Sequence, residues 1–391
     1  MTKTWMSAVL AVLASAIVAA GAAQAAEPVR IGFSIAQTGL FAAAAPSQLN
    51  AYGLWKDQVN AAGGLDVGGE KRPVEFVMYD DQSNPEQAVR IYEKLITEDK
   101  VELLLAPWGT PMHFAIAGVL EKNQFPMVGN SAASVQLRDL KPGNIWFPTS
   151  AIPDRMAEEL AKMLQANGVK SAAVLTNQLP FSLEIKQFLV PALAKAGIAT
   201  PVNDEYPPDV KDMTALLGKV KKAAPDAVLA LSYPNDSILY MNQAKEAGID
   251  APFQFVLVGP TIDFFGKMFG KDLDGIVTIG HWTPAKADWP KAKPFFDAYV
   301  AKFSANPDYL DSALAYMSCE ILQQAVAKAG LDKDKLREAI STMTFDTING
   351  PVKFEGVQNV TTPTSFLQFQ DGQAQLIWPP EAATAPYKPR G

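Results

Sequence analysis

Three short segments bring hydroxyl, small and aromatic side chains together where strand-like runs end. They lie at 36–41 (AQTGLF), 107–112 (PWGTPM) and 129–134 (GNSAAS). In open parallel α/β sheets, small molecules bind beyond the carboxyl ends of the strands. These three segments are therefore the first candidates for a ligand site.

The second segment carries the clearest signal for binding an anion. Thr110 is expected to cap a helix whose first turn begins at Pro111. Free backbone N–H groups after Gly109 and the positive end of the helix dipole then face the ligand, which suits a carboxylate. Trp108 offers a flat apolar wall. The alternative is structural, with Thr110 only capping the helix and Trp108 packing in a hinge.

Residues with the chemistry of metal sites are few. The two histidines, His113 and His281, are far apart and have no carboxylate or cysteine at ligand spacing. Cys319 lies in an apolar run that reads as a buried helix, so we interpret it as a core residue; the alternative is a reactive thiol. We predict no metal and no cofactor.

Enzyme motifs are also missing. The segment 32–39 (GFSIAQTG) is no dinucleotide fingerprint, there is no P-loop, and 129–133 (GNSAA) is no nucleophile elbow. Asp80 and Asp81 are adjacent at a strand end and point to opposite faces, so they are poor partners for one site. One of them is expected to cap the following helix. We predict that the chain is not an enzyme.

Strand-like runs alternate with amphipathic helices through most of the chain, which predicts parallel sheets covered on both faces. The expected strands are 29–35, 74–79, 101–106, 126–128, 172–176, 227–231, 253–257 and 275–279, with a hairpin at 366–370 and 375–378. The expected helices are 49–60, 85–98, 112–123, 155–166, 183–196, 213–223, 238–247, 294–304 and 309–329.

The first 25 residues are predicted to be a cleavable signal peptide. Lys3 precedes an apolar run at 6–20, and 23–25 (AQA) forms a cleavage signal. A membrane anchor is the weaker alternative, because the run falls short of the roughly 20 residues that a span needs. No cysteine stands directly after the cleavage site to carry a lipid anchor, so we expect a free protein in the periplasm.

The length of 391 residues exceeds the usual limit of about 250–300 residues for one hydrophobic core, so two lobes are expected. The net charge of −7, without basic clusters, argues against nucleic acid.

The segment 59–88 (VNAAGGLDVGGEKRPVEFVMYDDQSNPEQA) is the most informative stretch. A helix is expected to end at Gly63 and Gly64, a strand to run into the two aspartates, and a helix to open near Pro85. The turn N-A-x-G-G-L and the string D-D-x-x-x-P-x-x-A resemble the periplasmic branched-chain amino acid-binding family, the solute receptors of ABC importers.

This resemblance implies an α/β fold of two Rossmann-like lobes, the periplasmic binding protein type I fold, joined by a three-crossing hinge. The crossings are expected near 148–153, 280–284 and 365–369. The first lobe would comprise 26–149 and 281–365, the second 150–280 and 366–391, with the ligand cleft between them.

The resemblance also implies site residues. Family members hold the ligand carboxylate with a hydroxyl in the second segment and with backbone and hydroxyl groups in the third, which match Thr110 and 131–133 here. Ala133 stands where a hydroxyl is expected, so Ser131, next to Ala132, or Ser134 would substitute.

Aromatic residues are expected to wall the ligand. The family's first-segment aromatic falls near Ala44, in a run of small residues that begins with Phe41. Phe181 and Tyr233 of the second lobe are expected to close over the ligand, or else to pack in the core. Trp282, in the second crossing, is a further candidate.

One position departs from the family. Its amino acid-binding members supply a glutamate that pairs with the ligand ammonium, and the matching residue here is Thr261; Asp263 is the nearest carboxylate. This favours an aromatic or other non-amino carboxylate, with branched-chain amino acids and amides as alternatives. The implied function is capture by hinge closure, as a monomer, and delivery to an ABC permease and ATPase complex in the inner membrane. A receptor of the same fold that signals to a partner is the alternative.

Overall fold

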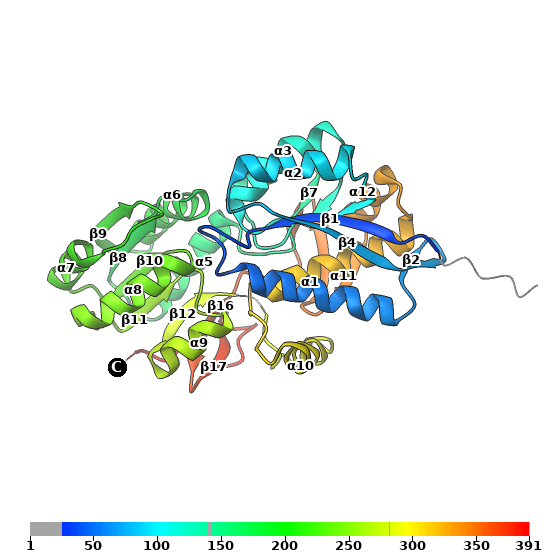
Figure 1. Cartoon of the computed structure of the whole chain (residues 1–391). Helices are drawn as coiled ribbons and strands as arrows, with labels where there is room; N and C mark the ends of the chain where they lie inside the picture. Colours follow the sequence, from blue (N-terminus) through cyan, green and yellow to red (C-terminus); the bar gives the residue numbers. More distant parts are fainter. Residues whose placement is uncertain (1–25, 140–142, 281, 391) are drawn as a thin grey trace, which may run out of the picture.

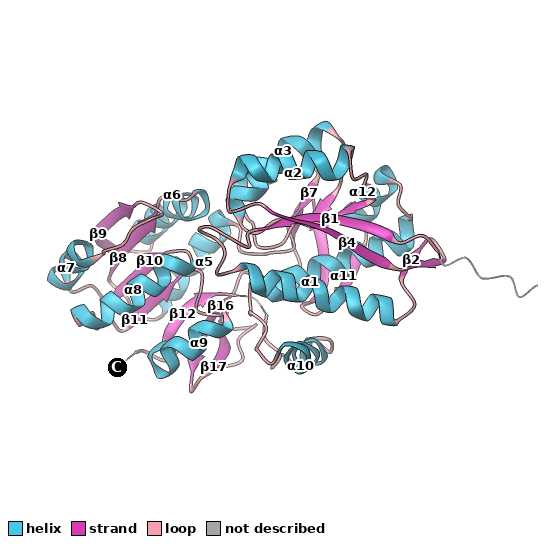
Figure 2. Ribbon diagram, in the orientation of Figure 1, coloured by secondary structure: helices cyan, strands magenta, loops and turns pink. Residues whose placement is uncertain are grey.

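The chain folds into two α/β halves that lie side by side (Figure 1). The computed structural model describes residues 26–139, 143–280 and 282–390, so the predicted signal peptide lies outside the described residues. In each half, helices cover strands on both faces (Figure 2).

The first half is built on short parallel strands. Its main sheet has the order β4-β1-β5, and β6 pairs in parallel with β7. These strands are β1 (Val29–Ile35), β4 (Val74–Asp80), β5 (Leu103–Leu104), β6 (Met127–Val128) and β7 (Ile145–Trp146). The helices between them are α1 (Ala45–Ala61), α2 (Pro85–Thr97), α3 (Thr110–Lys122) and α4 (Val135–Arg138), and a hairpin of β2 (Leu65–Val67) and β3 (Glu70–Arg72) follows α1.

The second half holds a seven-stranded sheet of order β17-β16-β12-β11-β10-β8-β9. Its parallel strands are β8 (Ser171–Asn177), β9 (Ala199–Tyr206), β10 (Ala227–Leu231), β11 (Phe253–Val256) and β12 (Ile276–Ile279). Its helices are α5 (Pro153–Ala166), α6 (Pro180–Lys195), α7 (Thr214–Ala223), α8 (Pro234–Ala247) and α9 (Asp263–Phe269), followed by the short helix η1 (Gly270–Leu273). The predicted hairpin of β16 (Phe366–Gln370) and β17 (Gln373–Trp378) is present, and β16 runs antiparallel to β12.

The chain crosses between the halves three times, as predicted. After β12 it returns to the first half, where α11 (Asp311–Ala329) packs on α1, and it then re-enters the second sheet at β16. The return also contains α10 (Ala292–Phe303), α12 (Lys333–Thr342), β13 (Thr344–Thr347), β14 (Gly350–Glu355) and β15 (Gln358–Asn359). Two crossings touch: the Ser150 hydroxyl donates to Pro363 O at 2.9 Å, and the Thr364 hydroxyl donates to Ser150 O at 2.6 Å.

Local sequence explains the element ends around the 59–88 segment. Helix α1 stops before the two glycines, and Gly64 has a φ of 110° with the Arg72 carbonyl 2.4 Å from where a Cβ would stand. Only glycine fits there. Helix α2 begins at Pro85, with the Asn84 side chain accepting from Gln87 N at 3.1 Å. The prediction that Asp80 or Asp81 caps this helix was therefore wrong.

Strand β9 was not predicted. It lies at the sheet edge, contains Pro201 and three polar residues in a row, and buries only Val202 and Tyr206. Edge strands tolerate proline and charge because one side makes no ladder hydrogen bonds. The apolar periodicity that reveals the central strands is therefore weak here.

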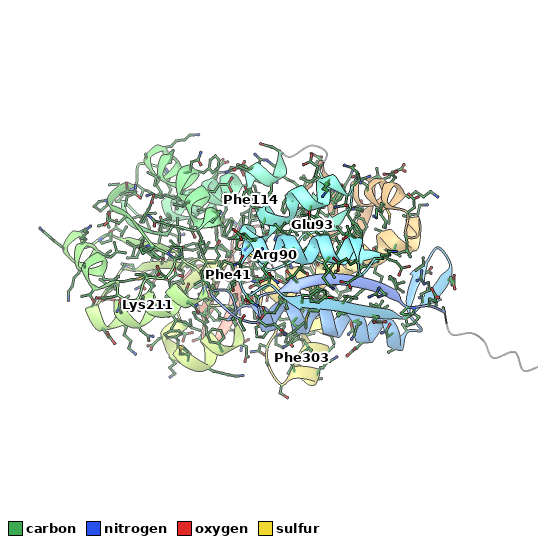
Figure 3. The ribbon with its side chains drawn as sticks, turned by 45° about the horizontal axis from the view of Figure 1, so that its top comes forward. Phe41, Arg90, Glu93, Phe114, Lys211 and Phe303 are labelled. Carbon is green, nitrogen blue, oxygen red and sulfur yellow. The ribbon has the colours of Figure 1, made fainter. Side chains whose placement is uncertain are left out.

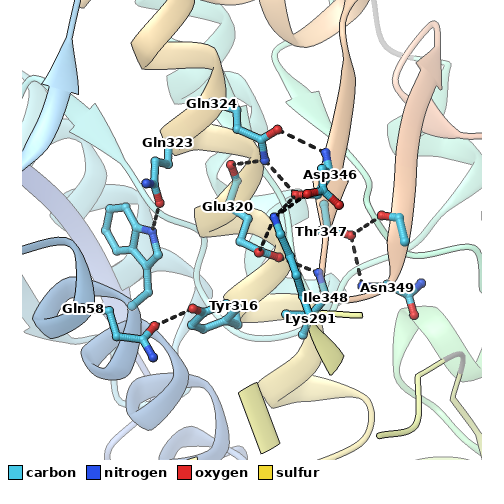
Figure 4. A network of polar contacts seen from close by, with 12 residues as sticks. Gln58, Lys291, Tyr316, Glu320, Gln323, Gln324, Asp346, Thr347, Ile348 and Asn349 are labelled. Atoms are coloured by element: carbon cyan, nitrogen blue, oxygen red, sulfur yellow. Dashed lines mark hydrogen bonds and ion pairs between the residues drawn. The ribbon is translucent and has the colours of Figure 1, made fainter. Parts of the chain in front are cut away.

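A buried carboxyl ties α11 to the strand region that follows it (Figure 4). Glu320 accepts from Ile348 N at 2.7 Å and lies 3.4 Å from the Lys291 ammonium, which also contacts Asp346 at 2.9 Å. Burial raises the pKa of Glu320 from 4.5 to about 7, although the positive charge of Lys291 opposes the rise.

Replacing Glu320 by glutamine is expected to change how stability depends on pH. The folded protein holds the Glu320 proton more tightly than the unfolded chain, so this group lowers the free energy of unfolding as pH rises from about 4.5 to 7, by up to about 3 kcal/mol. Denaturant unfolding at pH 5 and pH 7.5 should show a smaller decrease for Glu320→Gln than for wild type. The control Glu338→Gln changes an exposed residue of α12. Parallel curves for all three proteins would contradict the assignment.

Candidate ligand-binding site

The first segment is held in place by the two aspartates that end β4. Asp81 accepts from the Ser34 hydroxyl at 2.6 Å, and Asp80 accepts from Gln37 N at 3.0 Å. The Ser83 hydroxyl then accepts from Phe41 N at 2.9 Å. This local network fixes the Phe41 ring between the two halves (Figure 3). Asp80 and Asp81 therefore position the first segment.

The second and third segments are joined directly. The Ser131 hydroxyl accepts from Gly109 N at 3.1 Å, and the Thr110 hydroxyl lies 3.3 Å from both the N and O atoms of Ala133. Helix α3 begins at Thr110, and Gly109, with a φ of 81°, stands at the cap position without a side-chain hydrogen bond. Thr110 therefore does not cap α3, which corrects the prediction: its side chain bridges to the neighbouring segment instead.

Polar groups that do not line the cavity support the second and third segments. Asn130 donates to the Tyr52 hydroxyl at 2.8 Å, which in turn donates to Ala106 O at 3.1 Å. His113 places Nδ1 at 2.9 Å from Gly109 O, and burial lowers the pKa of His113 to about 4. His113 is thus neutral near pH 7 and acts as part of the scaffold.

A cavity opens where these segments meet the second half. Most of its lining is apolar, with a few hydroxyl and backbone groups among the apolar side chains, as is usual for sites that bind small molecules. It is lined by Trp108, Gly109, Thr110, Ser131, Ala132, Ala133, Thr149, Ala151, Phe181, Tyr233, Val258, Ile279, Leu310, Asp311 and Leu314. Among the described residues, no lysine, arginine or histidine lines the cavity.

Aromatic rings from both halves meet at this cavity. The Phe41 ring lies 5.2 Å from that of Trp108 and 6.0 Å from that of Tyr233 between centroids, and Trp108 and Tyr233 are also 6.0 Å apart. Tyr233 and Phe181 stand at the starts of α8 and α6, as residues beyond strand ends should. Burial raises the pKa of Tyr233, and the Asp236 charge adds to the rise, whereas the backbone of Phe181 opposes it. The Tyr233 phenol is therefore uncharged.

Seven of the ten predicted residues line the cavity: Trp108, Gly109, Thr110, Ser131, Ala132, Phe181 and Tyr233. Phe41 packs behind them on Trp108. The other two lie elsewhere. Asp263 accepts from Asn306 N at 2.9 Å and pairs with Lys267, and Trp282 is fully buried and donates to Ile348 O at 3.1 Å. The structure thus corrects the placement of Asp263 and Trp282 in the site.

Asp311, at the start of α11, is the lining residue of most consequence that the sequence did not reveal. Its Oδ2 accepts from the Trp108 indole N–H at 2.9 Å, and its Oδ1 has no hydrogen-bond partner among the described residues. Asp311 is distant in sequence from the three segments and falls inside the helix expected at 309–329, so no local pattern marked it as a site residue.

Comparison with known proteins identifies the family. The sequence matches the family of periplasmic binding proteins over residues 28–374. The chain belongs to this family. The resemblance drawn from the 59–88 segment and the predicted type I fold are thereby confirmed for this periplasmic binding protein.

Relatives and solved structures agree with this placement. Leu/Ile/Val-binding protein homolog 7 of Brucella melitensis is 24% identical over 400 residues, which cover 96% of this chain and 97% of that one. The substrate binding protein LivJ of the branched-chain amino acid transporter of Streptococcus pneumoniae, in complex with isoleucine, superposes with a TM-score of 0.79 at 23% identity and covers 89% of this chain and 98% of its own. A solute binding protein of an ABC transporter from R. palustris, in complex with benzoate, gives a TM-score of 0.79 at 17% identity, with 93% and 97% covered.

The described residues of this periplasmic binding protein were also considered as membrane-spanning helices and as metal ligands. None of the helices found there combines the length and the apolar character that a membrane crossing requires. Within the same residues, histidine, cysteine, aspartate and glutamate form no group of three or more arranged to hold a metal ion. Cys319 is fully buried, as expected for a core residue.

Replacing Trp108 by phenylalanine is expected to cost more stability than replacing Trp146. Both indoles are buried, but only Trp108 donates a hydrogen bond, since the Trp146 N–H has no partner among the described residues. The difference should be about 1–2 kcal/mol, the usual loss for a buried hydrogen bond. Denaturant unfolding of Trp108→Phe and Trp146→Phe measures it. Equal losses would mean that the bond to Asp311 adds nothing.

Proposed function

We propose that this protein captures a small carboxylate-bearing molecule in the cavity between its halves and delivers it to an ABC permease and ATPase complex in the inner membrane. The observation that carries the proposal is the junction of the second and third segments, where Gly109, Thr110 and Ser131 present the start of α3 and two hydroxyl groups to the cavity. Backbone N–H groups at a helix start and hydroxyls suit a carboxylate.

An aromatic or other non-amino carboxylate is the ligand class that we favour. Aromatic rings surround the cavity, and Thr261 stands where amino acid-binding relatives are expected to carry a glutamate. The benzoate complex of the R. palustris protein supports this choice, whereas the isoleucine complex of LivJ supports the branched-chain alternative.

Several further features belong to the same proposal. The lobes would comprise 26–149 with 281–365 and 150–280 with 366–391, closing on the ligand as a hinge. The mature protein would be a periplasmic monomer, released by cleavage after Ala25. Because the family consists of binding proteins, we expect the ligand to leave the site chemically unchanged.

A thermal-shift screen of the mature protein tests the ligand class. A ligand at 100 times its dissociation constant adds about 2.7 kcal/mol to the folded state and raises the melting temperature by a few degrees. Benzoate and 3,4-dihydroxybenzoate are expected to give this shift, with leucine, isoleucine and benzamide as comparisons. A shift with leucine alone would overturn the aromatic-acid proposal.

Replacing Thr110 by valine is expected to weaken binding of the carboxylate identified in that screen by about 10- to 100-fold, the usual value of a hydrogen bond to a charged group. Thr110→Ser keeps the hydroxyl and should stay close to wild type. Thr97→Val removes a hydroxyl that bonds within α2, far from the cavity, and serves as the control. Isothermal titration calorimetry gives the dissociation constants of the three variants and of wild type. Wild-type affinity in Thr110→Val would place the carboxylate elsewhere.

A further inference from the structure

A buried carboxyl group faces the cavity without a cation to balance it. Asp311 is 2% exposed and lines the cavity, and its Oδ1 has no hydrogen-bond partner among the described residues. Among the described residues, neither Asp311 nor its neighbour Asp308 forms an ion pair, and no basic side chain lines the cavity. An ionised carboxylate in such surroundings is costly.

The two aspartates receive different numbers of hydrogen bonds. Asp308 accepts at Oδ1 from Leu310 N at 2.7 Å and from Asp311 N at 3.2 Å, and the Thr261 side chain is a further donor to it. Asp311 receives a single bond, from Trp108, at Oδ2. Burial raises the pKa of both carboxyls. Because two adjacent buried carboxyls resist ionising together, the larger number of hydrogen bonds to Asp308 favours the charge on Asp308 and the proton on Asp311.

Oδ1 is the oxygen that is free to carry this proton. Oδ2 already accepts the Trp108 indole hydrogen, so a proton there would compete with that bond. A proton on Oδ1 turns the unpartnered atom of this cavity-lining residue into a hydrogen-bond donor. Burial, and then the charge of Asp308, raise the pKa of Asp311 well above its ordinary value, which agrees with this assignment.

We propose that Asp311 enters ligand binding as an uncharged carboxylic acid whose Oδ1–H donates to an acceptor oxygen of the ligand, and so selects organic acids and amides over α-amino acids. This inference rests on the proposed function, because it assigns the specificity of the same cavity. A ligand ammonium at Oδ1 would meet a proton donor where it needs an acceptor. A carboxylate or carbonyl oxygen would instead gain a hydrogen bond, which is strong when the acceptor is charged.

Few titratable groups surround Asp311. Asp308 lies in the loop just before α11, and Tyr233 lines the cavity from the second half. Tyr299 contacts Ser312, the residue after Asp311, and its pKa is also raised by burial. Both phenols are uncharged over the physiological range, so the pH response of the site depends on the two aspartates.

The variant Asp311→Asn distinguishes a protonated Asp311 from an ionised Asp311. Its amide keeps an N–H donor in place of Oδ1–H and an oxygen acceptor for Trp108, and it never ionises. Asp311→Leu removes both functions at similar size. Asp263→Asn changes a carboxyl group that lies outside the cavity and serves as the matched control.

The first measurement uses the mature full-length protein without ligand. A group whose folded-state pKa is raised destabilises the fold progressively as pH increases from its unfolded value to its folded value. The melting temperature of wild type should therefore fall by several degrees relative to Asp311→Asn between pH 5 and pH 8, with Asp263→Asn parallel to wild type. A constant difference between wild type and Asp311→Asn over this range would overturn the inference, whatever the ligand.

The second measurement uses benzoate, benzamide and leucine as probes in calorimetric titrations. Asp311→Asn is expected to bind benzoate or benzamide within about threefold of wild type at pH 7, whereas Asp311→Leu should lose at least tenfold, the loss of one hydrogen bond. Wild-type affinity for benzoate should fall as pH rises toward 9, and that of Asp311→Asn should stay level.

The two measurements distinguish failure of the inference from failure of the proposed function. Leucine binding that Asp311→Asn abolishes would show an ionised Asp311 paired with an ammonium and would overturn the inference. If none of the three probes binds while the melting temperatures behave as expected, the protonated Asp311 is supported and the proposed ligand class fails.

Discussion

The hydrogen bonds that join the second and third segments are the constraint on which the site depends. Gly109 N reaches the Ser131 hydroxyl, and the Thr110 hydroxyl reaches Ala133, so the loops that follow β5 and β6 act as one surface. Because this surface includes the start of α3, it also fixes the direction of the helix and the place of the Trp108 ring. Loops held in this way are preorganised, so less conformational entropy of the protein is lost when a ligand binds.

The proposed hinge motion has to break the contacts between the two halves. Asn235 donates to Leu40 O at 3.0 Å, and the rings of Trp108 and Tyr233 meet across the cleft. A partly exposed hydrogen bond contributes only about 1 kcal/mol, and an aromatic pair is similar. A ligand that touches both halves therefore needs only a few kcal/mol of differential affinity to shift the population toward closure.

The sequence predicted the central strands and the two segments that line the cavity from the first half, because both follow from local rules. Strands β1 and β10 have the predicted bounds, since continuous apolar runs bounded by turns mark strands buried on both faces. The edge strand β9 and the bridging role of Thr110 were missed because neither depends on a local pattern. Asp311 was missed for the same reason: it meets Trp108 across 203 residues of sequence, and only the fold brings them together.

The proposed function gives a meaning to the absence of basic side chains among the described residues that line the cavity. A lysine or arginine facing a ligand carboxylate would add strong attraction in a dry site, but each ion pair costs several kcal/mol of desolvation and is hard to separate again. In the proposed complex, hydroxyls, backbone N–H groups and an uncharged acid would hold the same carboxylate through several moderate bonds. The proposed hinge opening would break these bonds one lobe at a time, since Thr110 and Ser131 belong to the first half and Tyr233 to the second. Specificity then comes from the number and direction of donors, while the free energy needed for release stays within the range of a hinge motion.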